Sequence, residues 1–231
     1  MKIFSVDFGN LGDYTAYSVI EAEEKWESPE VNGIKRMKQR AHYVFKVRYL
    51  ERVSAEMSYP EIIKDIKTKL KHPKVAGSQL VVDGTGVGLP VLQEMQEQGL
   101  NPIGICITGG QNVGEWKARS GSRLGYTVPK RDIVTTLQNA FASRRLIIPR
   151  KLAHADAFVE ELVNFKLKIS RNGSDTYEAW RESIHDDLVL SVGIGVWYVA
   201  YVYGLTRAVA RDNVEVLTEM LKAENYDPLN I

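Results

Sequence analysis

The sequence predicts one α/β domain with a single mixed β-sheet and helices on both faces. Three observations support this fold class. The first third of the chain is rich in β-forming segments, two later apolar runs are typical of buried parallel strands, and helical patterns separate and follow these runs. With 231 residues, the chain is long enough for a large hydrophobic core. We expect one domain over residues 1–231, with its core at about 1–205 and a helical tail at about 206–231.

The composition is that of an ordinary globular protein. Hydrophobic residues make up 44% of the chain and charged residues 26%. The formal net charge of +1 does not identify a nucleic-acid-binding protein, so that interpretation must rest on local charge. The single cysteine, Cys106, lies in an apolar run and excludes both a disulfide framework and a cysteine-based zinc site.

The chain opens with a predicted β-hairpin. An apolar run at residues 2–8 contains Asp7 near its end and is followed by Gly9. A turn rich in Gly and Asn comes next, and a second β-rich run begins at Thr15. Because the chain opens directly in a strand, we expect no signal peptide. A carboxylate at the end of a buried strand either caps the turn or binds a cation, and both interpretations of Asp7 stay open at this point.

The next elements complete an antiparallel half and begin a parallel half. Residues 21–40 predict a loop or an extended hairpin tip, and 42–51 alternate as in a half-buried third strand. Ser58 and Pro60 predict the start of a helix that ends near residue 72. Residues 79–83 form a continuously apolar strand that ends in Asp83 and leads into a glycine-rich turn.

The second half of the chain is predicted to alternate between helices and short β segments. We expect helices at about 90–98, 131–142 and 154–164, and a buried strand at 103–107. Residues 109–126 predict a loop or a β-insert, and 146–149 a short apolar run. Asn172 and Gly173 between residues 165–169 and 176–180 predict a hairpin.

An uncharged segment at 188–205 raises the question of a membrane span. Its length of roughly 18 residues is at the threshold for crossing a bilayer. Its serine, three glycines and three tyrosines, and the acidic pair directly before it, favour a helix buried within the protein core. We therefore expect no membrane association, and an amphipathic helix at the end of the chain.

Four aspartates occupy positions that suit a metal site: Asp7, Asp83, Asp186 and Asp187. If the first and fourth strands are parallel neighbours, Asp7 and Asp83 lie at the same carboxyl edge of the sheet. Carboxylates that converge repel one another unless a cation lies between them, and an all-oxygen set suits Mg²⁺ or Mn²⁺. The alternative for Asp186 and Asp187 is a helix cap with favourable charge near the helix dipole.

Four stretches in this order resemble the nuclease domain of the large terminase subunit of tailed bacteriophages, in the RNase H-like superfamily. They are Asp7-x-Gly9 with Asp13-x-Thr15, Val82-Asp83-x-Thr85-Gly86-Val87-Gly88, the run from Arg145 to Pro149 through Glu160-Glu161-Leu162, and His185-Asp186-Asp187-Leu188-Val189. The resemblance implies an RNase H-like mixed sheet with three antiparallel strands followed by parallel ones. It also implies a metal-dependent endonuclease that cuts concatemeric double-stranded DNA during genome packaging in the host cytoplasm.

Partners of the protein follow from the same resemblance. It implies double-stranded DNA, a packaging ATPase domain, a small terminase subunit and a portal protein. The chain has no Gly-x-x-x-x-Gly-Lys-[Ser/Thr] phosphate loop, so we expect the nuclease domain alone, without ATP hydrolysis. The other classes considered are another RNase H-like nuclease or resolvase, an actin-like phosphotransferase and a non-catalytic DNA-docking module.

The resemblance assigns roles to individual residues. Asp7 would bridge two Mg²⁺ or Mn²⁺ ions, Asp83 would hold one, and Asp186 and Asp187 would hold the other. Asp186 is ranked first of that pair, because it shares a helix face with the small residue Gly193. The auxiliary candidates are Asp13, His185 and Thr85, although His185 also suits a capping or packing role. DNA contacts are expected from basic residues in two stretches, Lys35, Arg36, Lys38 and Arg40 in the first and Lys117, Arg119, Arg123, Lys130 and Arg131 in the second.

Overall fold

An eight-stranded mixed sheet is the centre of the structure, a computed structural model. The structure describes residues 1–9, 13–27, 30–31, 34–35, 40–85, 88–118, 120–171 and 186–204. The chain divides into two compact units, Met1–Trp197 and Tyr198–Ile231, and the sheet belongs to the first. The predicted tail at 206–231 lies outside the described residues.

The sheet has an antiparallel half and a parallel half that meet at β1. Its strand order is β10-β5-β2-β1-β6-β7-β9-β8. The antiparallel half contains β1 (Lys2–Asp7), β2 (Thr15–Glu27) and β5 (Arg40–Val53). The parallel half runs from β1 to β6 (Gln79–Asp83), β7 (Ile103–Thr108) and β9 (Arg123–Pro129). This arrangement confirms the predicted mixed sheet and makes β1 and β6 parallel neighbours.

Short strands complete the two edges of the sheet and the tip of a hairpin. At one edge, β8 (Gly114–Lys117) pairs antiparallel with β9, and at the other β10 (Leu146–Ile147) pairs parallel with β5. A separate two-stranded sheet contains β3 (Glu30–Val31) and β4 (Ile34–Lys35). Because β2 and β5 pair as far as Glu27 and Arg40, the segment at 21–40 is an extended hairpin.

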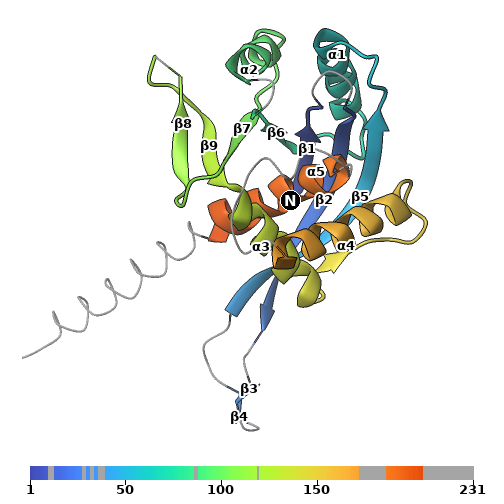
Figure 1. Cartoon of the computed structure of the whole chain (residues 1–231), viewed down its shortest axis with the longest axis vertical. Coiled ribbons are helices and arrows are strands. Elements are labelled where there is room, and N and C mark those ends of the chain that lie inside the picture. Colours follow the sequence, from blue (N-terminus) through green and yellow to red (C-terminus); the bar gives the residue numbers. More distant parts are fainter. Residues whose placement is uncertain are drawn as a thin grey trace, which may run out of the picture. The chain divides into compact units, whose positions relative to one another are not determined.

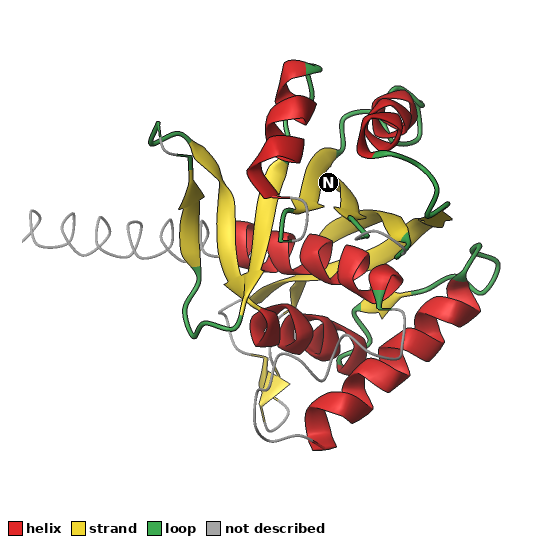
Figure 2. Cartoon of the chain, turned by 45° about the horizontal axis from the view of Figure 1, so that its top comes forward, coloured by secondary structure: helices red, strands yellow, loops and turns green. Residues whose placement is uncertain are grey.

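Helices cover both faces of the sheet. Helices α1 (Tyr59–Leu70) and α2 (Gly88–Glu97) pack on the face that carries Phe4 and Val82. Helix α5 (Asp187–Tyr198) lies on the opposite face, where Gly195 approaches Ser5, and α3 (Lys130–Ala142) packs beside it. Figures 1 and 2 both show α1 and α2 grouped apart from α3, α4 (Ala155–Arg171) and α5. The chain therefore has helices on each side of one sheet, as predicted.

The predicted hairpin over 165–180 is wrong in its first half. Helix α4 continues to Arg171 and includes residues 165–169, while 176–180 lie outside the described residues. The alternation of apolar residues at 165, 167 and 169 is a short-range strand signal. A helix that has already begun at Ala155 adds residues at little cost until it meets a breaker, and the first one is Gly173.

The uncharged segment divides between the two units. Its first part is α5, in which every residue is buried, and a π-helix at Val199–Tyr203 belongs to the second unit. The buried character of α5 confirms the core interpretation. Among the helices that the structure describes, none has the length and apolarity that a membrane crossing requires.

Candidate active site

Four strands place one row of side chains at an edge of the sheet. Asp7 on β1 pairs with Ala16 on β2, and Ala16 pairs with Arg52 on β5. On the other side of β1, Val6 pairs with Val82, so Asp83 on β6 is the next position beside Asp7. Directly paired residues share one face of a sheet. The row therefore reads Arg52, Ala16, Asp7, Asp83, on the face covered by α5.

Asp7 and Asp83 form a buried carboxyl pair. Each residue is only 8% exposed, and the two side chains share a hydrogen bond. Burial raises the pKa of Asp7 well above its usual value, and the charges of Asp83, Asp186 and Asp187 raise it further. A hydrogen bond between two carboxyl groups requires a proton on one of them. We therefore regard Asp7 as the protonated member.

Thr85 fixes the direction of the Asp83 carboxylate. Its backbone N–H donates to Asp83 Oδ1 at 2.8 Å, and its hydroxyl donates to the same oxygen at 2.5 Å. The Thr85 hydroxyl oxygen in turn accepts the backbone N–H of Ile107 at 2.7 Å. Burial raises the pKa of Asp83, while these bonds from Thr85 oppose the rise. Thr85 thus fixes the position of the Asp83 carboxylate.

The two aspartates before and in the first turn of α5 have different surroundings. The Asp186 carbonyl accepts the Leu190 N–H at 2.8 Å, so Asp186 is the residue that precedes the helix. Its carboxylate is 31% exposed and lies 3.8 Å from Lys130 Nζ. Asp187 is buried, and Arg52 Nε donates to its Oδ2 at 2.7 Å. The negative charges of both carboxylates raise the pKa of Asp7, so both lie near it. All four predicted aspartates therefore lie at one end of the sheet.

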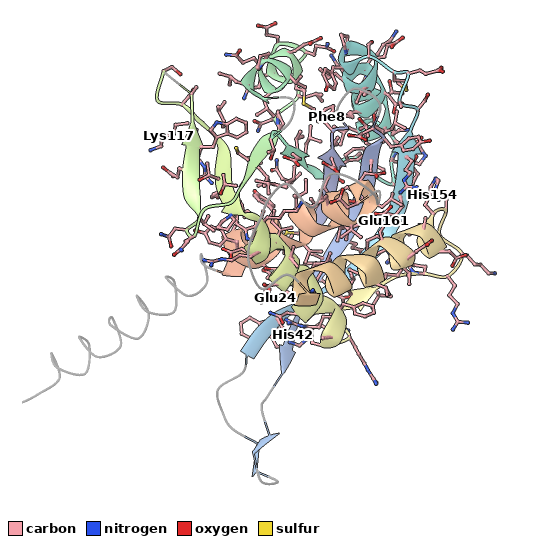
Figure 3. All side chains as sticks on the ribbon, viewed as in Figure 1. Phe8, Glu24, His42, Lys117, His154 and Glu161 are labelled. Atoms are coloured by element: carbon pink, nitrogen blue, oxygen red, sulfur yellow. The ribbon has the colours of Figure 1, made fainter. Side chains whose placement is uncertain are left out.

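Glu161, which Figure 3 labels on α4, contacts both Arg52 and the first turn of α5. It is 5% exposed, its Oε2 accepts the Val189 N–H at 3.0 Å, and its Oε1 pairs with Arg52. Burial raises the pKa of Glu161 to about 8; the Val189 N–H and Arg52 oppose the rise, and Asp187 adds to it. Arg52 therefore lies between two buried carboxylates, those of Glu161 and Asp187.

The chemistry of the donor set fits a divalent cation, although the side chains are not gathered around one point. Among the described residues, no three His, Cys, Asp or Glu side chains form a group that could hold a metal ion as they stand. The set nevertheless consists of four carboxyl groups, three of which are buried, those of Asp7, Asp83 and Asp187. Hard oxygen donors with uncompensated negative charge are what Mg²⁺ and Mn²⁺ select.

The other predicted residues that the structure describes have surroundings of their own. Asp13 is exposed, in a bend before β2. Lys117 pairs with Glu115 on β8, Arg123 stacks on the Tyr126 ring, and Arg131 donates to the Gln111 carbonyl. Figure 3 shows Lys117 on the opposite side of the view from Glu161. Outside the described residues lie His185, Arg36, Lys38 and Arg119, and the side chains of Lys35 and Arg40 are likewise not described.

Sequence reasoning missed Arg52 and Glu161 as members of the site. Arg52 enters it through strand register, which the sequence does not reveal, because Arg48 and Arg52 look alike in an alternating strand. Glu161 carried a signal, since a glutamate among the apolar positions of a helix implies a buried partner. The sequence does not show which residues are the partners of Glu161.

Comparisons with known proteins identify a shared fold. No protein-family model matches the chain, and no curated protein matches it. Among solved structures, the chain is similar to the large terminase nuclease from thermophilic phage G20c. That match has a TM-score of 0.50 at 16% sequence identity and covers 87% of this chain and 82% of the other. At this identity the likeness concerns the fold, and the chain has the mixed-sheet, RNase H-like architecture of that nuclease.

Proposed function

We propose that this chain is a metal-dependent endonuclease of the terminase type, which cuts concatemeric double-stranded DNA during genome packaging. The observation that carries the proposal is the buried Asp7–Asp83 pair, with Asp186 and Asp187 at the start of the helix above it. Burying several carboxylates together is costly, and proteins retain such clusters where the carboxylates bind a cation or take part in a reaction. The nuclease fold of the structural neighbour supports the same class of activity.

The proposed metal ligands are the four aspartates. Asp7 would bridge two Mg²⁺ or Mn²⁺ ions, Asp83 would hold one of them, and Asp186 and Asp187 the other. When bound, the two ions supply an activated water and stabilise the leaving 3′ oxygen of the DNA strand. The protein prepares for this by keeping Asp83 in one direction through Thr85. Asp7 would hold the ions in its deprotonated form.

The DNA substrate would be held by its phosphates. Lys117 and Arg123 are exposed side chains on the two paired strands β8 and β9, and Lys130 begins α3 beside Asp186. A basic strand pair suits a phosphate backbone, and phosphate contacts carry little sequence preference. By the same terminase assignment, the packaging ATPase, the small subunit and the portal would be protein partners.

A plasmid assay tests this function. Wild-type protein with supercoiled plasmid should give nicked and linear DNA in Mg²⁺ or Mn²⁺, and none in excess chelator. Asp7→Asn and Asp83→Asn should each abolish the cutting. Asp156→Asn is the control, because Asp156 is an exposed aspartate in the first turn of α4. Full cutting in chelator, or by Asp7→Asn, would refute the proposal. Binding of DNA without any cutting would support a docking module.

A further inference from the structure

Arg52 connects three elements at the site. It lies in the same cross-strand row as Asp7, separated by the small residue Ala16, and its side chain is 21% exposed. One edge of the guanidinium donates to Asp187 through Nε, and Nη2 donates to Glu161. The Tyr14 ring lies 5.6 Å from the Arg52 Cζ atom. A planar guanidinium with two carboxylates on different nitrogen atoms has a fixed direction.

Glu161 caps α5 from another helix. Asp186 precedes α5, so the Val189 N–H is the third amide of the helix and has no acceptor within it. The side chain of the preceding residue usually accepts this amide. Here Glu161 of α4 accepts it at 3.0 Å. Glu161 thereby serves the role that an aspartate at position 186 would ordinarily serve.

These two residues together set the start of α5. Glu161 holds the backbone at Val189, and Arg52 holds the side chain of Asp187 while compensating the charge of Glu161. Both anchor points lie on elements that are packed into the core, β5 and α4. Removing Arg52 would take the cationic partner from the buried Glu161 carboxyl, and removing Glu161 would take the acceptor from the Val189 N–H. Either change would allow Asp187 to change rotamer.

We infer that Arg52 and Glu161 are positioning residues of the carboxylate site, which fix the end of α5 and the direction of Asp187 before any metal binds. The inference rests on the proposed nuclease function, because it assigns a purpose to the direction of Asp187. Residues that orient metal ligands through a second layer of contacts typically change metal affinity by roughly tenfold to a hundredfold when replaced.

The direction in which one substitution changes the affinity for Mn²⁺ distinguishes a positioning role of Arg52 from simple charge balance. Arg52→Gln removes a positive charge next to the carboxylates. If Arg52 only balanced charge, its loss would make the site more negative and Mn²⁺ would bind more tightly. If Arg52 positions Asp187, Mn²⁺ should bind about tenfold more weakly. Arg52→Lys keeps the charge but lacks the planar fork, so its affinity for Mn²⁺ should lie between those of wild type and Arg52→Gln.

The experiment is a titration of the purified full chain with Mn²⁺, followed by calorimetry in the absence of DNA, with thermal melts in chelator. Arg48→Gln is the matched control on β5, since Arg48 forms an exposed pair with Glu21. Glu160→Gln is the matched control on α4, next to the buried Glu161. Both controls should bind Mn²⁺ within about twofold of wild type, whereas Glu161→Gln should bind it several-fold more weakly.

Each outcome decides a different claim. Unchanged or tighter Mn²⁺ binding by folded Arg52→Gln overturns the positioning inference and leaves the nuclease proposal intact. If Arg52→Gln fails to fold, the double variant Arg52→Gln with Glu161→Gln removes both charges of the pair, and wild-type Mn²⁺ affinity in it overturns the inference equally. If the wild-type chain neither binds Mn²⁺ nor cuts plasmid DNA, the proposed function fails and the inference fails with it.

Discussion

Asp7 and Asp83 share a hydrogen bond between the ends of two neighbouring parallel strands. Both residues are buried, and Asp186 and Asp187 add further negative charge from α5. The arrangement stores electrostatic repulsion in the folded protein, because an ionised Asp7 would face three other carboxylates. Such repulsion lowers the stability of the folded chain, and proteins typically keep a cost of this kind at functional sites.

Replacing Asp7 by asparagine should abolish cleavage and leave the melting temperature unchanged or raised. Asparagine keeps a donor for Asp83 and stays uncharged at every pH. At a pH where Asp7 would ionise, about 1 kcal/mol of relief would raise the melting temperature by about 2–4 °C for a domain of this size. Differential scanning calorimetry in chelator measures the change. A fall in melting temperature of more than a few degrees would mean that the interaction between Asp7 and Asp83 stabilises the fold.

Stability of the metal-free protein should decrease as pH rises. The folded-state pKa of Asp7 lies above its ordinary value of 3.8, and that of Glu161 is about 8 against an ordinary 4.5. Between these values the folded chain retains protons that the unfolded chain has released, so stability is lost as pH rises from about 4 toward 8. Denaturant unfolding at pH 5 and pH 8 in chelator measures this, and Asp7→Asn should reduce the slope. Greater wild-type stability at pH 8 than at pH 5 would contradict the assignment.

The helix aspartates should differ in their effects, with Asp186 the more important for cleavage. The sequence basis for this ranking is wrong in one respect. A Cβ atom on Gly193 would meet Ile133 of α3 at 3.0 Å, whereas one on Gly195 would meet Ser5 of the sheet at 2.7 Å. The ranking keeps a structural basis, because Arg52 holds the Asp187 carboxylate at 2.7 Å, whereas the Lys130 contact of Asp186 is longer, at 3.8 Å.

We therefore expect Asp186→Ala to lose all cleavage with little change in melting temperature, since its pair with Lys130 is long and partly exposed. Asp187→Ala should retain some cleavage and melt several degrees lower, because Arg52 loses a buried partner. Cleavage rates and melts of both variants measure the difference. Complete loss in Asp187→Ala with activity in Asp186→Ala would reverse the ranking.

Charge removal at Lys117, Arg119 and Arg123 should weaken DNA binding equally for unrelated sequences. Each lost phosphate contact should lower the slope of log affinity against log salt by roughly one. Fluorescence anisotropy with two unrelated duplexes at several salt concentrations measures both effects. Lys64→Gln, an exposed change on α1, is the control. A change in sequence preference alone would identify these residues as base readers.

The sheet was largely predictable because its strands carry strong local patterns. The run that ends in Asp83 is continuously apolar and forms β6, and the alternation at 42–51 lies within β5. The sequence does not decide between a loop and a β-insert for the β8–β9 pair, because the stretch is Gly-rich and has few apolar residues. Trp116 packs over Gly84 and Gly104, where an added Cβ would come within 2.5 and 2.8 Å of its ring. No local sequence pattern predicts this packing of Trp116 against two glycines.

The site was predictable where strand ends determine position, and not where register or helix contacts do. Asp7 and Asp83 follow from the rule that parallel strands end at one edge. The Arg52 contact with Asp187 joins residues that are 135 positions apart, and the Glu161 contact with Val189 joins two separate helices. Such pairs depend on the whole packing of the chain, which no single stretch encodes.

The most direct test of the central claim is a crystal soaked in Mn²⁺, with the ions located by anomalous diffraction. The proposed nuclease site predicts Mn²⁺ in contact with Asp7 and Asp83, a second ion at the helix aspartates, and loss of the hydrogen bond between Asp7 and Asp83 as the shared proton leaves. Crystals that bind Mn²⁺ elsewhere, or that keep the Asp7–Asp83 bond at saturating Mn²⁺, would contradict it.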